Sequence, residues 1–258
     1  MNYTFADTTL LITHYNRSES LERLLSAFER LNCTFGAIIV SDDGSRPEHL
    51  NRIRDLKYRF SIQLITAEVN KGLGNNINKG QDAVETAFTL YVQEDFEPSD
   101  IFPVHFENAL SFMRNDPKLD IVRFYAYFKY PNLKPFKNGY SEMVYSFWDM
   151  NHLKFYYYSD HPHLRRSNFF EKFGRYPEGI KGDLTEYKMA ISFLQNKGKG
   201  LFFNDFTKLF YQKNSSDEPS TMERPDWRLS KNPVIQLSRL IYLRYRWLKN
   251  TVDLFIMK

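Results

Sequence analysis

AIIVSDDGS, residues 37–45, is a short apolar run that ends in two acids, a glycine and a serine. An apolar run of this length bounded by turn-forming residues predicts a buried strand. Asp42 and Asp43 stand where that strand should end. A carboxylate there can accept the imide N–H of a pyrimidine base or a ribose hydroxyl, but an Asp-Gly pair also builds a turn without any ligand. Alone, the segment leaves both interpretations open.

The same pattern continues outward on both sides of this segment. Buried strands are predicted at 8–13, 37–40, 62–65 and 88–92, with helical spacing between them. Strands and helices that alternate in this way predict right-handed βαβ units, and therefore an α/β fold with a mostly parallel sheet flanked by helices. Ligands of such sheets bind beyond the carboxyl ends of the strands. Each predicted strand here ends in a polar cluster, which indicates a binding site at that edge.

Glu94 and Asp95 follow the fourth predicted strand. Most acidic pairs are solvated loop residues, but this one is expected on the same sheet edge as Asp42 and Asp43. Mg²⁺ and Mn²⁺ take carboxylate oxygens, commonly one or two from the protein with the rest from substrate phosphate. The pair therefore predicts a divalent metal bridging the phosphates of a nucleotide, where it would neutralise charge on a leaving diphosphate.

NKGLGNNINKG, residues 70–80, contains three glycines and four asparagines before a predicted helix at about 75–86. Glycine lets backbone approach a ligand closely, and the start of a helix favours anions. The segment lacks both the Gly-Lys-Ser/Thr of a Walker loop and the G-x-G-x-x-G fingerprint. By itself it is a weak phosphate-binding signal.

Taken together and in this order, LLITHYNRSESLERLL, IIVSDDGS, NKGLGNNINKG and LYVQEDFEP resemble the nucleotide-binding half of family 2 glycosyltransferases of the bacterial polysaccharide type. The resemblance covers about the first hundred residues and implies a GT-A fold. It implies transfer of a sugar from a nucleoside diphosphate sugar, UDP favoured, to a saccharide or lipid-linked saccharide, as in polysaccharide or lipopolysaccharide synthesis. Transfer should be inverting and use Mn²⁺ or Mg²⁺.

The resemblance also implies roles for single residues, with Asp95 as the metal ligand. The residues expected to bind the nucleotide-sugar are His14, Tyr15, Asn16, Asp42, Asp43, Asn78, Gly80 and Glu94.

In that family an acid at the start of a later helix is the general base. The candidates are Glu186, which is favoured, and Asp183. Their spacing also suits a helix cap, with Asp183 on backbone N–H groups and Glu186 favoured by the helix dipole. His161, His163, Arg165 and Arg166 are weighed as diphosphate or metal ligands against a packing role.

Composition limits the class of protein. A net charge of +4 is too small to predict a nucleic-acid partner. The single cysteine, Cys33, excludes an intrachain disulfide and fits a reducing compartment. The N-terminal residues show no secretory signal peptide, and no apolar run is long enough for a membrane-spanning helix, so a cytoplasmic protein is expected. We expect a nucleotide-binding half at 1–98, an acceptor-binding and catalytic half at 99–215, and a linker with a C-terminal helix at 216–258.

Residues 233–258 predict a basic amphipathic helix. Leu237, Leu240, Ile241, Trp247, Leu248, Leu254 and Phe255 should share one side, with Arg239, Arg246, Lys249 and Asp253 largely opposite. Such a helix fits an anionic membrane surface, here the inner face of the cell membrane. Docking on the core or on another subunit, as in a homo-oligomer, fits equally well.

Two other classes of function fit part of the pattern. A nucleotidyltransferase also uses a parallel sheet and an acid-bound metal, but it should carry a glycine-rich basic loop after the first strand, where this chain has THYN at 13–16. A non-catalytic carbohydrate- or partner-binding module is suggested by the irregular acids at 183–186.

Overall fold

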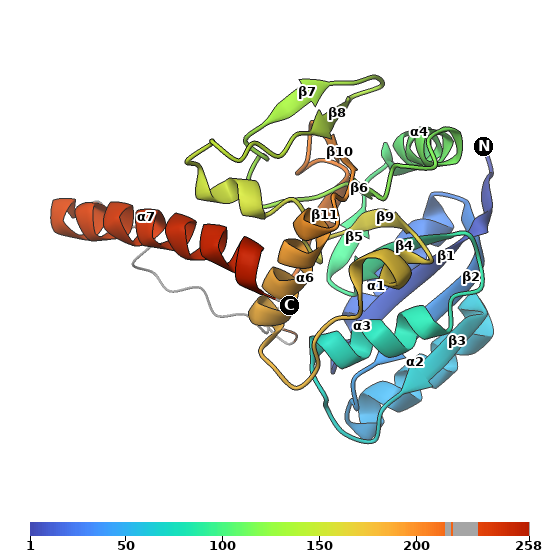
Figure 1. Ribbon diagram of the computed structural model, residues 1–258. Coiled ribbons are helices and arrows are strands. Elements are labelled where there is room, and N and C mark those ends of the chain that lie inside the picture. The colour runs from blue at the N-terminus through green and yellow to red at the C-terminus, as the bar shows by residue number, and fades with distance from the viewer. Residues whose placement is uncertain (215–217, 219–231, 258) are drawn as a thin grey trace.

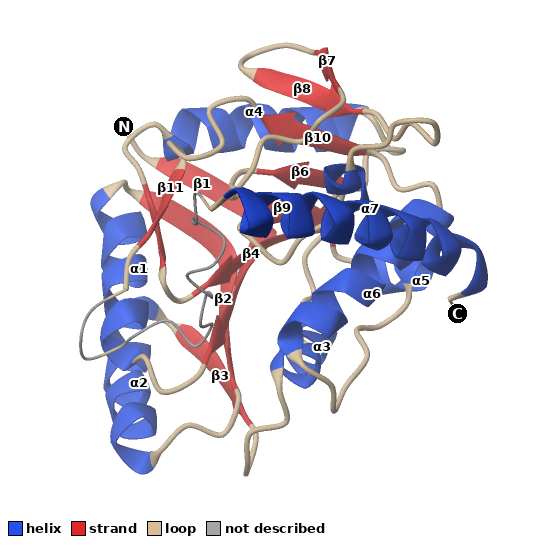
Figure 2. Cartoon of the chain, turned by 90° about the vertical axis from the view of Figure 1, so that its left-hand side faces the viewer, coloured by secondary structure: helices blue, strands red, loops and turns tan. Residues whose placement is uncertain are grey.

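The computed structural model describes residues 1–214, 218 and 232–257 (Figure 1). Its main feature is a nine-stranded sheet with the strand order β3-β2-β1-β4-β9-β6-β10-β8-β7. Helices cover both faces of this sheet (Figure 2). The predicted α/β class, with a mostly parallel first half, is confirmed.

The first half follows the predicted alternation closely. The four parallel strands and the three helices between them are β1 (Tyr3–His14), α1 (Ser18–Arg30), β2 (Cys33–Asp42), α2 (Pro47–Phe60), β3 (Ile62–Thr66), α3 (Leu73–Asp82) and β4 (Phe88–Gln93). Pro47 opens α2, because its fixed φ suits the first turn of a helix. Arg17 takes the N-cap position of α1, and Ser18 and Ser20 both lie inside that helix.

The second half extends the same sheet with shorter strands. β9 (His163–Arg166) enters antiparallel between β4 and β6 (Ile121–Arg123). Beyond β6 lie β10 (Gly200–Phe203), β8 (Tyr140–Met143) and β7 (Leu133–Pro135), while β5 (Phe96–Pro98) and β11 (Phe210–Gln212) pair separately. The helices of this half are α4 (Phe102–Asn115), η1 (His152–Phe155), α5 (Phe169–Phe173), α6 (Gly182–Gln195) and α7 (Pro233–Ile256). Since β4 pairs with β9, the two predicted halves share one sheet.

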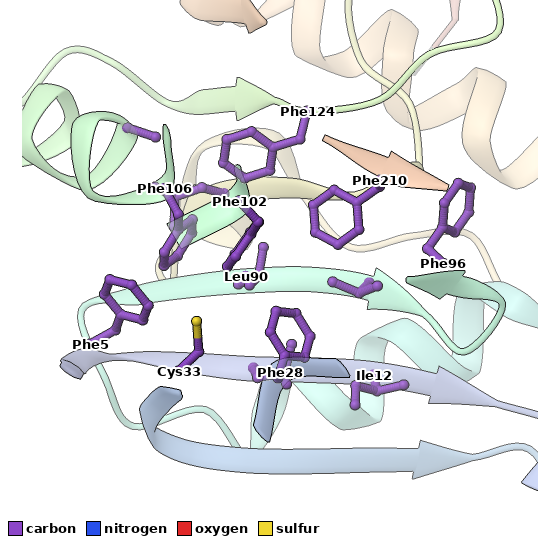
Figure 3. Close-up of a cluster of buried hydrophobic side chains, with 14 of the residues drawn as sticks. Phe5, Ile12, Phe28, Cys33, Leu90, Phe96, Phe102, Phe106, Phe124 and Phe210 are labelled. Carbon is purple, nitrogen blue, oxygen red and sulfur yellow. The ribbon is translucent and has the colours of Figure 1, made fainter. Parts of the chain in front are cut away.

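Side chains alternate across the strands and build a core on each face. Leu10 and Ile12 of β1 pack with residues of α1, α2 and α4, whereas Leu11 packs with residues of α3, α5 and α6. The first core is rich in phenylalanine (Figure 3), with Phe102 and Phe106 stacked at a centroid distance of 5.0 Å. Much of the aromatic content of the chain therefore fills core rather than lining a site.

α7 docks through its C-terminal half and projects away from the sheet through the other half (Figure 1). Tyr187 of α6 donates its hydroxyl to Asp253 at 2.7 Å, and Trp247 donates to the Asp149 carbonyl at 3.0 Å. Leu237, Leu240, Ile241 and Leu248 are exposed. The predicted faces are therefore partly wrong: Trp247 turns toward the protein with Arg246 and Asp253.

Among the described residues, no helix is both long and apolar enough to cross a membrane.

Candidate active site

The carboxyl ends of β2, β1 and β4 bring the predicted site residues into one row. His14 is the β1 partner of Asp42 in β2, and Thr13 is the partner of Gln93 in β4, so His14 and Glu94 come next in line. Tyr91 of β4 pairs with His163 of β9, and the chain enters β9 from Asp160. The acids at 42–43 and 94–95 therefore lie on the same edge of the sheet, as predicted.

Asp42 and His14 tie the ends of β2 and β1 together. His14 donates Nδ1–H to Asp42 Oδ1 at 2.8 Å, while its Nε2 accepts the Arg17 backbone N–H at 3.1 Å. Asp42 Oδ2 accepts the backbone N–H groups of Gly44 and Ser45. Burial alone would raise the pKa of Asp42, but the hydrogen bonds from His14 and Ser45 outweigh it and lower the pKa. These two side chains join the ends of the two strands, and nucleotide binding by either of them remains a prediction.

Asp43 anchors the glycine-rich segment to the same edge. Its two oxygens accept the backbone N–H groups of Lys71 and Gly72, each at 2.9 Å. Burial raises the pKa of Asp43, although these two N–H groups partly offset it. Lys79 was not predicted as a site residue, yet its Nζ donates to the Asp42 carbonyl at 2.7 Å and places a positive charge near both acids.

Asn78 and Gly80 have packing contacts in the structure. The Asn78 amide exchanges hydrogen bonds with the backbone of Tyr176 and donates to Glu178 Oε1. A Cβ added to Gly80 would lie 2.7 Å from Leu11 and 2.9 Å from Ser41, so only glycine lets α3 sit this close to the sheet. Nucleotide binding by either residue remains a prediction.

Tyr15 and Asn16 line the loop that follows β1, and both are partly exposed. Asn16 adopts a positive φ of 53° and accepts the Arg46 N–H through its side-chain oxygen. Nucleotide binding by Tyr15 and Asn16 remains a prediction.

Glu94 and Asp95 meet the guanidinium of Arg17. Arg17 Nη1 lies 3.2 Å from Asp95 Oδ2 and 3.5 Å from Glu94 Oε1, and Gln212 of β11 also donates to Asp95 Oδ2 at 2.9 Å. Burial and the neighbouring Asp95 charge raise the pKa of Glu94 to about 8, against the opposing effect of Arg17. Sequence reasoning missed Arg17 and Gln212, because neither belongs to an acidic motif.

The Asp95 carboxylate fits a divalent cation. Its Oδ1 is buried and has no hydrogen-bond partner among the described residues, and a buried carboxylate oxygen normally has one. The described residues contain no group of three or more His, Cys, Asp or Glu side chains placed to hold a metal. A metal at Asp95 would therefore need further oxygens from substrate phosphate and water, as Mg²⁺ and Mn²⁺ accept.

Residues after β11 cover this acidic pair. Arg17 Nη2 donates to the Asn214 side chain at 2.6 Å and to the Glu218 carbonyl at 3.1 Å. The Glu218 carboxylate accepts the N–H groups of Glu19 and Ser20 in the first turn of α1. Residues 215–217 and 219–231, which include most of the linker predicted to begin at residue 216, lie outside the described residues.

Of the two candidate bases, Glu186 is the one that faces the sheet edge. Its Oε1 accepts the Asp160 backbone N–H at 3.0 Å. Asp183 is exposed and caps its own neighbour, accepting the Leu184 N–H. Burial raises the pKa of Glu186, while the Asp160 N–H and the charge of Arg123 oppose that shift.

The HPHLRR segment is largely structural. His163 is buried, with its ring near Tyr91 and its Nδ1 donating to the His161 carbonyl at 2.7 Å. Arg165 is also buried and donates to Gln81 at 2.7 Å. Arg166 donates to three backbone carbonyls near the opposite sheet edge.

The sequence model described as glycosyl transferase family 2 matches residues 9–176, which include β1 to β4 and the acids just described. The chain belongs to glycosyl transferase family 2. It is therefore a glycosyltransferase, and the nucleotidyltransferase and non-catalytic alternatives are set aside.

Solved glycosyltransferase structures share the fold. TarS 1–349 of S. aureus in complex with UDP-GlcNAc superposes with a TM-score of 0.62 at 16% identity, over 92% of this chain and 66% of that one. GalNAc-T7 with UDP, GalNAc and Mn²⁺ superposes with a TM-score of 0.55 at 13% identity, over 76% of this chain and 42% of that one. The GT-A-like architecture is thus established.

A poly-beta-1,6-N-acetyl-D-glucosamine synthase of Staphylococcus epidermidis is 26% identical over 114 residues, or 44% of this chain and 27% of that protein. The chain thus spans about a quarter of the length of the curated relatives it matches.

We predict that Asp42→Asn destabilises the glycosyltransferase at neutral pH by about 2 kcal/mol, because charge-assisted hydrogen bonds are lost. Folding lowers the pKa of Asp42. The ionised side chain therefore stabilises the fold at pH values above the ordinary pKa of Asp, and this stabilisation is lost as the pH falls through the lowered pKa of the folded state. Urea unfolding of both proteins across acidic and neutral pH measures this. The difference should shrink in acid, and Asp55→Asn, at an exposed position of α2, should show none. A difference independent of pH would contradict the assigned role.

Proposed function

We propose that this glycosyltransferase moves a sugar from a UDP-sugar to a saccharide or lipid-linked saccharide, with inversion at the anomeric carbon and with Mn²⁺ or Mg²⁺. The observation that carries the proposal is the row of Asp42, His14 and Glu94 along one sheet edge, beside the unpartnered Asp95 oxygen. A pyrimidine nucleotide fits one end of this row and its diphosphate fits the other.

The nucleoside end is formed by Tyr15, Asn16 and Asp43. A partly exposed ring and a carboxylate suit stacking on uracil and hydrogen bonding to its imide N–H. Glu94 lies further along the row, and with a pKa of about 8 it keeps its proton at neutral pH. It can therefore donate a hydrogen bond to a ribose oxygen. UDP is favoured because solved neighbours hold UDP-GlcNAc or UDP.

The diphosphate end is formed by Arg17 and Asp95. Asp95 would hold the metal, which when bound supplies positive charge against the leaving diphosphate. Arg17 lies 3.2 Å from the same carboxylate and adds a fixed positive charge at this position. Both effects stabilise the negative charge that develops as the sugar departs.

Glu186 would act as the base on the acceptor side. The acceptor oxygen forms a bond to the anomeric carbon while the bond from that carbon to the diphosphate oxygen breaks. The acceptor hydroxyl proton passes to Glu186, and the nucleoside diphosphate leaves with the bonding electrons. Attack opposite the leaving group inverts the anomeric carbon and needs a single base.

α7 would place the enzyme on an anionic membrane surface, where a lipid-linked acceptor is found. Its exposed side carries Leu240, Ile241 and Tyr245, with Arg244 also exposed. Apolar side chains can enter the headgroup region, and each cation near an anionic surface contributes about 1 kcal/mol. The projection of this helix away from the sheet leaves that side accessible (Figure 1).

We expect UDP to raise the melting temperature more with Mn²⁺ than without it, and more than GDP or dTDP does. A ligand at about 100 times its Kd stabilises by about 2.7 kcal/mol, which is measurable by thermal shift. Asp95→Ala should lose the metal-dependent part, whereas Asp100→Ala, at an exposed position beyond β5, should keep it. Equal stabilisation of Asp95→Ala with and without metal, at the wild-type level, would remove Asp95 from the metal site.

Glu186→Gln should bind UDP normally but lower kcat by about 10²- to 10⁴-fold, the usual contribution of a general base. Release of UDP from UDP-sugars measures turnover, since water can replace a missing acceptor. Asp183→Asn is the comparison, because Asp183 is exposed and makes a local contact. If Asp183→Asn loses more turnover than Glu186→Gln, Asp183 is the base.

Sedimentation with vesicles tests the role of α7. The wild-type chain should sediment with phosphatidylglycerol vesicles and less with phosphatidylcholine alone. Exchange of Leu240 and Ile241 for serine should weaken that binding at least tenfold, since two exposed apolar side chains are lost. Tyr58→Ser, at an even more exposed site on α2, is the control. Unchanged binding by the α7 variant would rule out membrane docking through this face.

A further inference from the structure

Asp160 is a buried acid that neither the sequence motifs nor the mechanism above uses. It precedes β9 and is 3% exposed. The last residue pair between β4 and β9 is Tyr91 with His163. Glu94 comes three residues after Tyr91, and Asp160 comes three residues before His163. Because the two strands are antiparallel, both lie beyond the same end of the pair, and Asp160 continues the row of site residues toward the proposed acceptor side.

The surroundings of Asp160 leave one of its carboxylate oxygens unsatisfied. Oδ1 accepts the hydroxyl of Tyr176 at 3.2 Å. Oδ2 is buried and has no hydrogen-bond partner in the described part of the chain. A buried, ionised carboxylate with an unpaired oxygen is costly, and protonation removes that cost.

Asp160 also touches the proposed base. Glu186 Oε1 accepts the backbone N–H of Asp160 at 3.0 Å, so the two acidic residues are in direct contact. The charge of Glu186 disfavours ionisation of the buried Asp160 side chain beside it. Arg123 lowers the pKa of Glu186 and so favours its charged form.

We propose that Asp160 and Glu186 form one acid pair in which Asp160 keeps a proton and Glu186 carries the single negative charge. Asp160 is then a positioning residue, because its neutral side chain lets Glu186 stay on the N–H group at residue 160. Ionised Asp160 would repel the Glu186 carboxylate from that contact. The assignment rests on the proposed role of Glu186 as base.

Electrostatic surroundings agree with this division. Burial, followed by the charge of Glu186, raises the pKa of Asp160 to about 8. The ionisable groups that face the pair come from every element around it: Tyr91 of β4, Arg123 of β6, Tyr158 and Tyr176 of the flanking loops, Arg165 of β9, and Asp183 of α6. The three tyrosines and Asp183 carry no positive charge that could stabilise ionised Asp160. Arg165 is positively charged, but its guanidinium donates to the hydroxyls of Tyr158 and Tyr176.

The test is the melting temperature against pH, without donor or metal. A raised pKa favours the folded state at low pH, and this advantage is lost as pH rises toward the folded value near 8. Asp160→Asn removes that dependence. Relative to wild type, its melting temperature should therefore rise by about 5 °C or more between about pH 5 and about pH 8.5. In a Glu186→Gln background the rise should shrink, because the repelling charge is gone.

Asp205→Asn, at an exposed ion pair with Lys208, is the matched control and should show no such rise. A constant difference between Asp160→Asn and wild type at all pH values would mean a merely structural role and overturn the pair. So would a rise that Glu186→Gln leaves unchanged.

Turnover provides the second readout. The kcat of the wild-type enzyme should fall above about pH 8, and the decline should be weaker in Asp160→Asn, where only Glu94 still loses a proton in this range. An alkaline decline as steep in Asp160→Asn as in wild type would contradict the proposal. If the melting-temperature coupling is present but wild type turns over no nucleotide-sugar, the acid pair stands and the proposed function fails. If turnover is present but the melting-temperature coupling is absent, the proposed function stands and the acid pair fails.

Discussion

The hydrogen bond between His14 and Asp42 fixes the geometry on which the rest of the site depends. It joins the carboxyl ends of β1 and β2, and the second nitrogen of His14 receives the N–H of Arg17. Arg17 is thereby held as the residue before α1, with its guanidinium turned toward Asp95. One buried imidazole thus links the end of β2 to the acids that follow β4, with one ring nitrogen that donates and one that accepts.

Charge along the sheet edge is divided by environment rather than by residue type. Asp42 has donors on both oxygens and a lowered pKa, whereas Glu94 and Asp160 have few donors and raised pKa values. Donors on both oxygens favour the anion of Asp42, whereas burial favours the neutral forms of Glu94 and Asp160. Such separation lets one sheet edge hold an anionic carboxylate beside carboxylic acids that can donate hydrogen bonds.

The sequence predicted the first half of the fold because the signals there are local. Apolar runs, Pro47 and the Asp-Gly turn each fix a strand, a helix start or a turn within a few residues. β9 was different, since its place between β4 and β6 depends on pairing with residues 40 or more positions away. For the same reason the acids after β2 and β4 could be placed, whereas Arg17, Lys79 and Asp160 could not: their roles arise from contacts across the sheet edge.

For Asn78, the role expected from the family resemblance differs from the contacts seen in the structure. Asn78 matches the closing motif of the family, yet its amide holds the backbone of Tyr176, whose hydroxyl contacts Asp160. A residue expected beside the nucleotide therefore also supports the segment around Asp160, through a tyrosine that no motif marked. This connection runs from α3, which Asp43 anchors through the Lys71 and Gly72 N–H groups, to Asp160 and Glu186. A ligand that contacts Asp43 would consequently act on the segment that holds Glu186, the proposed base, because the two are parts of one hydrogen-bonded edge.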